Sequence, residues 1–215
     1  MAAARCNTRY LPQAKFPDAL IVVDRLEDAV AGVNDILIAV PSHALRSVLI
    51  ELAPLLSSSA RLAWATKGFE LDTGLLPHQV AKEILGTDRP FAVLSGPTFA
   101  QEVGQGLPTA MTIASADEAF AQSLAQSLSA DNFRAYTSSD IVGVEVGGAI
   151  KNVLAVGAGL ADGLGFGANT RVALITRGLV EMTRKRIGEG LLESFATQCP
   201  DCEGRGVQVD PDLLV

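Results

Sequence analysis

Apolar residues follow two alternating patterns along the first part of the chain. Short apolar runs predict strands at 35–40, 61–66, 91–95, 109–114 and 133–137. The continuous run at 35–40 is of the kind that is buried on both faces. Between these runs, apolar residues recur at helical spacing and predict helices over 42–56, 75–85 and 117–128, with Asp117 near the cap of the last. Alternating strands and helices are typical of parallel β-α-β units, so we expect an α/β fold with a doubly wound sheet.

The pattern changes near Ser139. Asp140 is placed to cap a helix that continues through Ile150 to Val156, and Asn169 to Arg184 predicts a second helix. No strand is predicted between 140 and about 186. We therefore expect three parts: an α/β domain over 1–139, the start of a helical domain over 140–183, and a polar tail over 184–215.

Composition narrows the class of protein. Hydrophobic residues make up 48% of the 215 residues, enough for a sizeable core. A net charge of −7 disfavours nucleic acid as a partner. Three cysteines do not form a disulfide framework, which favours the cytoplasm. The N-terminus lacks an apolar signal core, and the apolar stretch Val153–Phe166 is short and contains Asp162, so no membrane partner is expected.

Polar motifs follow three of the predicted strands. Pro41-Ser42-His43, Thr66-Lys67-Gly68 and Ser95-Gly96-Pro97-Thr98 each begin where an apolar run ends. Ligands bind at the carboxyl ends of strands in open parallel sheets, so these motifs predict one crevice. Alternatives stay open: Lys67 as a solvated surface lysine, His43 as an N-cap or core residue, and Ser95–Pro97 as a strand-to-helix turn.

Lys151 lies among tiny and apolar neighbours, in Gly147-Gly-Ala-Ile-Lys-Asn-Val-Leu-Ala-Val156. We expect such a lysine to be part-buried. Burial lowers the pKa of an amine, and an amine shifted in this way acts as a general base. The alternative is a lysine that extends its ammonium group to solvent from a helix end.

A series of motifs resembles the NAD(P)-dependent glycerol-3-phosphate dehydrogenase family. The resemblance covers about residues 5 to 182. The motifs occur in the family's order: Arg5–Pro12, Val40-Pro-Ser-His43, Ala65-Thr-Lys-Gly68, Ser95–Glu102, Gly106-Leu-Pro-Thr-Ala110, Gly148–Ala155, Ala161–Asn169 and Ala173–Gly178.

The resemblance implies a function and a set of site residues. The family interconverts sn-glycerol 3-phosphate and dihydroxyacetone phosphate with NAD or NADP. Lys151 matches the proton acceptor, and Lys67 matches a lysine that contacts both substrate and cofactor. Gly96 and Thr98 match substrate contacts, and Ala100 matches a cofactor contact.

The chain also departs from the family pattern. It contains no G-x-G-x-x-G loop, which in the family holds the cofactor pyrophosphate at a helix N-terminus. It also lacks the later Asp and the Ser-Arg-Asn cluster that bind the substrate in the family. We therefore expect a fragment with impaired activity, with unpaired sheet edges that drive association into a homo-oligomer.

The tail resembles a different family. Residues 181–215, with Cys199-Pro-Asp-Cys202, are similar to the zinc-link region of ribonuclease E/G proteins, in which two protomers share one zinc ion. A Cys-x-x-Cys pair from each of two chains completes a tetrahedral zinc site. The alternative function is thus a non-catalytic, zinc-bridged dimerisation protein, or a chimeric sequence with no function of its own. Unpaired thiols remain the alternative for the two cysteines.

Overall fold

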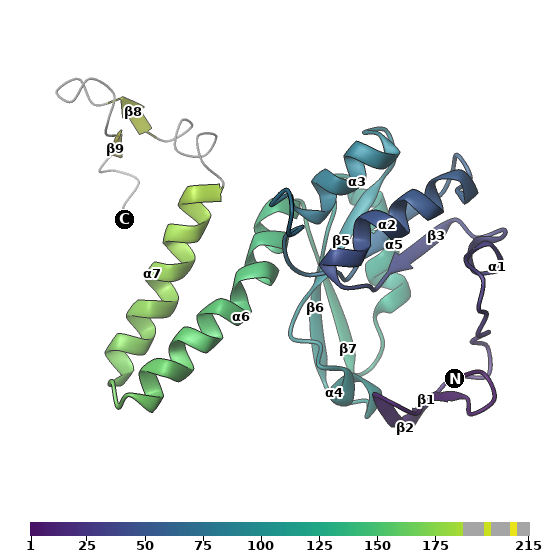
Figure 1. Ribbon diagram of the computed structural model, residues 1–215, viewed down its shortest axis with the longest axis horizontal. Helices are drawn as coiled ribbons and strands as arrows, with labels where there is room; N and C mark the ends of the chain where they lie inside the picture. The colour runs from purple at the N-terminus through teal and green to yellow at the C-terminus, as the bar shows by residue number, and fades with distance from the viewer. Residues whose placement is uncertain (187–195, 199–206, 210–215) are drawn as a thin grey trace. The chain divides into compact units, whose positions relative to one another are not determined.

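A computed structural model of the chain describes residues 1–186, 196–198 and 207–209 (Figure 1). The chain divides into two compact units, Met1–Ala149 and Ile150–Val215. Each unit is described by itself below.

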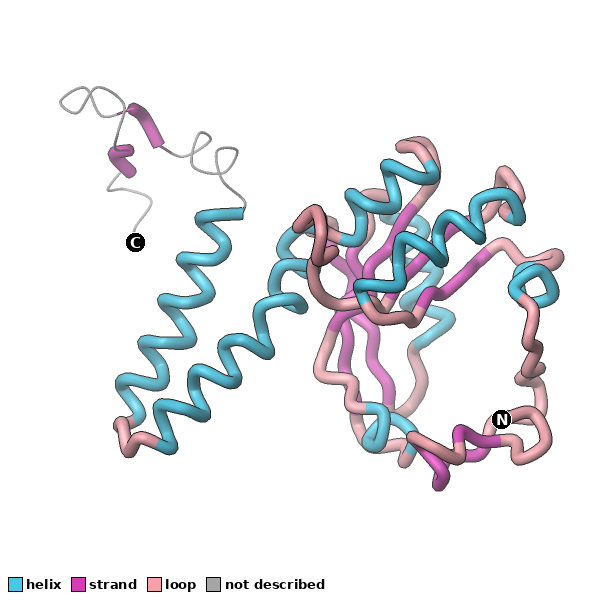
Figure 2. The backbone as a smooth tube through the Cα atoms, in the orientation of Figure 1, coloured by secondary structure: helices cyan, strands magenta, loops and turns pink. Residues whose placement is uncertain are grey.

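A five-stranded sheet, drawn in magenta in Figure 2, forms the centre of the first unit. Its strand order is β3-β4-β5-β6-β7. Its strands are β3 (Asp35–Ile38), β4 (Arg61–Trp64), β5 (Phe91–Ser95), β6 (Thr109–Ala114) and β7 (Phe133–Ser138). All five strands were predicted within two residues at each end. The apolar runs of β4 and β5 are buried, as expected for central strands. The expectation that 35–40 is buried on both faces is wrong, because β3 lies at the edge of the sheet and Leu37 on it is exposed.

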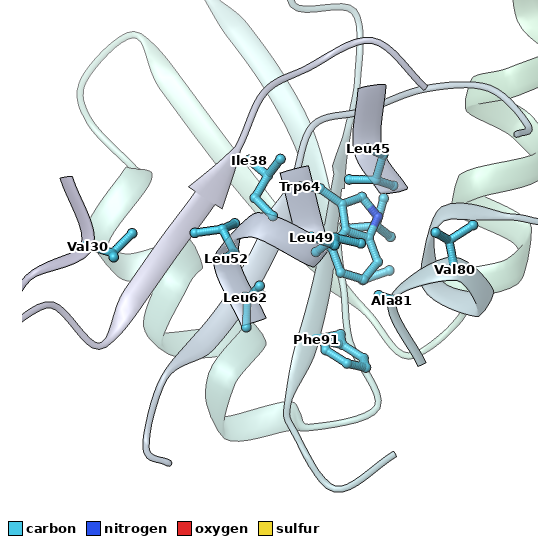
Figure 3. Packing of buried hydrophobic residues seen from close by; sticks show 12 residues of the cluster. Val30, Ile38, Leu45, Leu49, Leu52, Leu62, Trp64, Val80, Ala81 and Phe91 are labelled. Carbon is cyan, nitrogen blue, oxygen red and sulfur yellow. The ribbon is translucent and has the colours of Figure 1, made fainter. Parts of the chain in front are cut away.

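Helices cover both faces of this sheet. They are α2 (Ser42–Leu52), followed by the 3₁₀ turn η1 (Ala53–Leu55), then α3 (Pro77–Leu85) and α5 (Glu118–Leu128). The short helix α4 (Ala100–Gly104) contacts the N-terminal strand β2 (Leu11–Lys15) instead. Leu45 and Leu49 of α2 and Val80 of α3 pack with Trp64 and Phe91 on one face (Figure 3). On the other face, α5 packs on the alternate strand residues through Phe120 and Ala121. These two layers confirm the α/β class.

One strand pair departs from the predicted all-parallel arrangement. The pairs β3–β4, β4–β5 and β6–β7 are parallel, but β5 and β6 are antiparallel, with Ser95 opposite Thr112. In a parallel pair, the connecting segment must run back along the full length of the first strand, usually as a helix. The five-residue α4 between β5 and β6 is too short for that, since a helix rises only about 1.5 Å per residue.

The N-terminal segment contributes a small separate sheet. Strands β1 (Cys6–Asn7) and β2 (Leu11–Lys15) pair antiparallel, and the short helix α1 (Leu26–Val30) leads into β3. Gly104 of α4 lies against Leu11 and Ala14 of β2. Strand β3 is one edge of the main sheet, and Leu37 on it is 52% exposed.

Two aspartates cap helices as the sequence predicted. The Asp117 carboxylate accepts a hydrogen bond from the Phe120 amide at 2.9 Å, at the start of α5. The Asp140 carboxylate accepts one from the Gly143 amide at 2.7 Å, at the start of α6 (Ile141–Gly163). Each bond satisfies an amide that the helix itself leaves unpaired.

Helix α6 begins in the first unit and ends in the second. A turn through Gly165 connects it to α7 (Ala168–Arg186), and Arg171 of α7 donates to Asp162 at 2.9 Å. The short strands β8 (Ala196–Gln198) and β9 (Val207–Val209) pair antiparallel. By length and composition alone α6 passes as a membrane-crossing helix, yet its Glu145 side chain is buried among protein groups of the first unit.

Candidate functional site

The carboxyl ends of β3, β4 and β5 are adjacent and point the same way. The motifs Pro41-Ser42, Thr66-Lys67-Gly68 and Ser95-Gly96 therefore lie at one end of the sheet. We call Ser42, Lys67, Gly68, Ser95, Gly96 and Gly148 the strand-end site. The structure brings together the three motifs that the sequence placed in one crevice.

Two hydrogen bonds connect the three strand ends. The Thr66 hydroxyl donates to the Val40 carbonyl at 2.7 Å, which ties the end of β4 to the end of β3. The Lys67 ammonium donates to the Gly96 carbonyl at 3.0 Å, which ties β4 to β5. Lys67 is half-buried, not a solvated surface lysine, and its charge is held at a fixed place.

Two glycines make the close approach of these segments possible. Gly68 adopts φ +109°, a left-handed conformation that side chains rarely tolerate. At Gly96, a Cβ atom would lie 2.7 Å from the Ala110 carbonyl oxygen and 2.8 Å from the Met111 Cα. The turn after β5 therefore sits directly on the backbone of β6.

The first turns of α6 also reach this site. A Cβ atom on Gly148 would lie 3.0 Å from the Ser95 Oγ and 3.6 Å from the Lys67 Cγ. A side chain at 148 would thus crowd the Ser95 hydroxyl and would be in ordinary van der Waals contact with the stem of Lys67.

The remaining predicted residues lie on less enclosed segments. Thr98 is half-buried in the turn after β5, where its amide donates to the Gly96 carbonyl at 3.0 Å. Ala100 is exposed as the first residue of α4, and His43 is exposed in the first turn of α2. The core alternative for His43 is therefore wrong.

Lys151 lies in the second unit, on α6, and its side chain is exposed. The expectation that it is part-buried is wrong. Its apolar neighbour Val153 is 58% exposed, and Gly147 and Gly157 add no side chains to cover it. An apolar sequence environment therefore does not become a buried one here.

Sequence reasoning missed a buried carboxylate close to the strand-end site. Glu145 of α6 accepts hydrogen bonds from the Trp64 indole at 2.9 Å and from the His78 amide at 3.1 Å. Its other oxygen lies 2.6 Å from His78 Nδ1. The sequence signal was a single acidic residue between valines in a predicted helix.

The described residues offer no ready metal site. Among them, no group of three or more His, Cys, Asp or Glu side chains is arranged to hold a metal ion. The predicted zinc ligands Cys199 and Cys202 lie outside the described residues.

The adjacent ends of the parallel strands and the two helical layers define a Rossmann-type α/β domain, the class of fold that binds dinucleotides. Family models agree with this class and specify it further. The model for the N-terminus of NAD-dependent glycerol-3-phosphate dehydrogenase matches residues 1–121, and the model for its C-terminus matches residues 140–197. The second match extends into the tail, beyond residue 182 where the sequence motifs end.

Individual relatives carry the same name. The glycerol-3-phosphate dehydrogenase [NAD(P)+] of Bartonella henselae is 54% identical over 187 residues, covering 86% of this chain and 55% of the relative. That of Klebsiella pneumoniae is 54% identical over 181 residues, covering 84% and 53%. The crystal structure of glycerol-3-phosphate dehydrogenase from Coxiella burnetii is 43% identical with a TM-score of 0.79, covering 90% of this chain and 57% of that one.

The chain belongs to the NAD-dependent glycerol-3-phosphate dehydrogenase family. It spans about half the length of the curated relatives that it matches, 55% in the case of the Bartonella henselae enzyme.

Proposed function

We propose that this chain carries the proton-transfer and substrate-holding residues of a glycerol-3-phosphate dehydrogenase. The reaction is the interconversion of sn-glycerol 3-phosphate and dihydroxyacetone phosphate with NAD or NADP. Lys151 is the proposed catalytic residue, and Lys67, Gly96 and Thr98 hold the substrate. The observation that carries the proposal is the Lys67 ammonium fixed on the Gly96 carbonyl at the strand ends.

The strand-end site fits the nicotinamide end of the cofactor. Three parallel strand ends meet there, and Gly68 and Gly96 leave room for close approach of backbone. We assign Lys67 and Ala100 as cofactor contacts on this basis and on the family resemblance. The sequence has no G-x-G-x-x-G loop, so no residue is assigned to the pyrophosphate.

The proposed chemistry balances one hydride and one proton. A bound NAD or NADP would supply the acceptor for the hydride that leaves C2 of the alcohol. The neutral Lys151 amine takes the C2 hydroxyl proton, which leaves the ketone and a lysine ammonium. In the reducing direction, the Lys151 ammonium returns that proton to the ketone oxygen. The Lys67 ammonium holds negatively charged or carbonyl oxygen atoms of the substrate by charge-assisted hydrogen bonds.

The test is turnover of dihydroxyacetone phosphate with NADH or NADPH, followed by loss of the reduced cofactor. Lys151→Ala should abolish turnover, and Lys67→Ala should lower kcat/KM by about 100-fold or more, as expected when a charged contact is lost. Lys82→Ala, at an exposed position on α3, is the matched control. A folded chain without turnover, or a Lys151→Ala variant as active as the original, contradicts the proposal.

Four narrower proposals accompany this one. We propose a cytoplasmic, self-associating protein whose α/β domain ends near residue 139 and whose helical domain begins at residue 140. We also propose that Cys199 and Cys202 share a zinc ion with a second chain, because a Cys-x-x-Cys pair supplies two of four ligands. About half an equivalent of zinc per chain after dialysis supports the bridge, and a chain without zinc contradicts it.

A further inference from the structure

The Glu145 carboxylate is buried, at 1% exposure of its side chain. Burying a carboxylate is costly unless hydrogen bonds replace its water. Glu145 obtains them from the Trp64 indole and the His78 amide, and its second oxygen lies against His78 Nδ1. A fully satisfied buried network of this kind rigidifies the elements that it joins.

The network joins α3 and α6 to β4, the strand that leads to Lys67. Trp64 is the last residue of β4 and stands three positions before Lys67, while His78 lies in the first turn of α3. Glu145 therefore fastens the start of α6 to the end of β4. The packing of Ile141 and Val144 against the core that contains Trp64 supports the same attachment.

Glu145 and Gly148 lie three residues apart on α6, so they share one face of the helix. That face places Glu145 on Trp64 and, one turn later, the Gly148 backbone against Lys67 and Ser95. A shift or rotation of α6 would break both contacts together.

We propose that Glu145 is a positioning residue of the strand-end site: its carboxylate fixes α6 so that Gly148 keeps the Lys67 ammonium on the Gly96 carbonyl. The importance of Lys67 rests on the proposed function, but the positioning itself does not. Geometry, not charge, does the positioning. Glutamine at 145 keeps a carbonyl for the Trp64 and His78 N–H groups, and its amide can donate to His78 Nδ1. Leucine keeps the volume and removes every bond.

The experiment measures Lys67 directly. Lysines of the full chain are acylated with limiting acetic anhydride, and each site is quantified by peptide mass spectrometry, with exposed Lys15 and Lys82 as internal references. In Glu145→Leu, Lys67 acylation should rise roughly five- to thirtyfold, the range for loss of one buried hydrogen-bonded partner. Glu145→Gln should stay within about twofold of the original.

A second readout follows the network itself. Trp64 is the only tryptophan, so one indole ¹H–¹⁵N resonance reports on it. The resonance should move in Glu145→Leu and remain nearly in place in Glu145→Gln. An unchanged Lys67 rate in folded Glu145→Leu overturns the proposal. If Glu145→Leu does not fold, Trp64→Phe decides the question. It removes the indole N–H donor, leaves a smaller aromatic ring in the core, and should also raise Lys67 acylation. An unchanged rate there overturns the proposal equally.

These measurements need no turnover, so they separate the two proposals. If the chain has no activity but Glu145→Leu raises Lys67 acylation, the positioning role of Glu145 is supported and the proposed function is contradicted. Where turnover is present, Glu145→Leu should lower kcat/KM while Glu145→Gln restores it. If the chain is active and Glu145→Leu changes neither turnover nor Lys67 acylation, the proposed function is supported and the positioning role is overturned.

Discussion

The Arg46 guanidinium on α2 binds the Glu70 carboxylate through two hydrogen bonds, Nε to Oε1 at 2.7 Å and Nη2 to Oε2 at 2.9 Å. The bond from Arg46, followed by one from the Thr73 hydroxyl, lowers the pKa of Glu70 from its ordinary 4.5 to about 2. Arg46 also bonds Glu83 of α3 at 2.8 Å. One arginine thus connects α2 with the segment that leads into α3, and with α3 itself.

This pair predicts a specific acid sensitivity. A carboxyl whose pKa is lower in the folded state stabilises the fold above its unfolded pKa, and this stabilisation is lost as the pH falls. Arg46→Gln should therefore lower the urea midpoint at neutral pH. The difference from the original chain should shrink between pH 4.5 and about 2. Arg46 is one-third exposed, so solvent screening keeps the effect modest.

The control is the fully surface pair Arg25–Glu27, whose side chains are 67% and 51% exposed. Arg25→Gln should change the midpoint less than Arg46→Gln at neutral pH, because an exposed pair gains little from its charges. Equal effects of the two variants, or an Arg46→Gln effect that does not depend on pH, would show that Glu70 is not the group responsible.

The Gly96 turn predicts a steric effect. Gly96→Ala would bring a methyl group to 2.7 Å from the Ala110 carbonyl oxygen and 2.8 Å from the Met111 Cα, both in backbone. Because backbone cannot rotate away, we expect a loss of about 1–3 kcal/mol in the free energy of unfolding, measured by urea titration. In a chain with turnover, KM for the substrate should also rise.

Gly147→Ala is the matched control for Gly96→Ala. Its Cβ would meet no atom within 4 Å, and it lies inside α6. Alanine there should be neutral or stabilise by up to about 1 kcal/mol through helix propensity. If Gly96→Ala is as stable as Gly147→Ala, the prediction is contradicted, because the turn after β5 must then be able to move away from the backbone of β6.

Sequence reasoning recovered most of the α/β layer because its elements are set by local pattern. Buried apolar runs such as Phe91–Ser95 cannot be exposed cheaply, and Asp117 caps its own helix. The antiparallel direction of β6 was not predicted. It depends on how far the 96–108 connection reaches in space, which the alternation of apolar and polar residues does not encode.

The candidate site was predicted only in part for the same reason. Lys67 and Gly96 follow strands, so parallel pairing brings them together. Glu145 was missed because its partners Trp64 and His78 lie 81 and 67 positions away, and a glutamate on a helix looks solvated in sequence. The reverse error occurred at Lys151, where apolar neighbours suggested burial that α6 does not provide.

The cap of α6 predicts a stability effect close to the site. Asp140→Ala removes the acceptor for the Gly143 amide and should cost about 1 kcal/mol in the free energy of unfolding. Ser139→Ala, at the neighbouring exposed position, is the control and should be nearly neutral. Asp140→Asn, which retains a capping oxygen, should recover most of the loss. A full loss in Asp140→Asn would show that charge, not capping, stabilises α6 here.

The exposed edge of β3 predicts how the chain associates with itself. Apolar grooves lie on both faces of this edge strand, and half-exposed Leu37 lines each of them. An unpaired apolar edge is a template for pairing with another chain, and a lysine on it opposes that pairing. Leu37→Lys should therefore lower the average mass in light scattering. Ile50→Lys is the control, because Ile50 is 55% exposed on α2 and lines neither groove. A monodisperse monomer in the original chain would show that the chain does not self-associate. An equal average mass in both variants would show that association does not use the β3 edge.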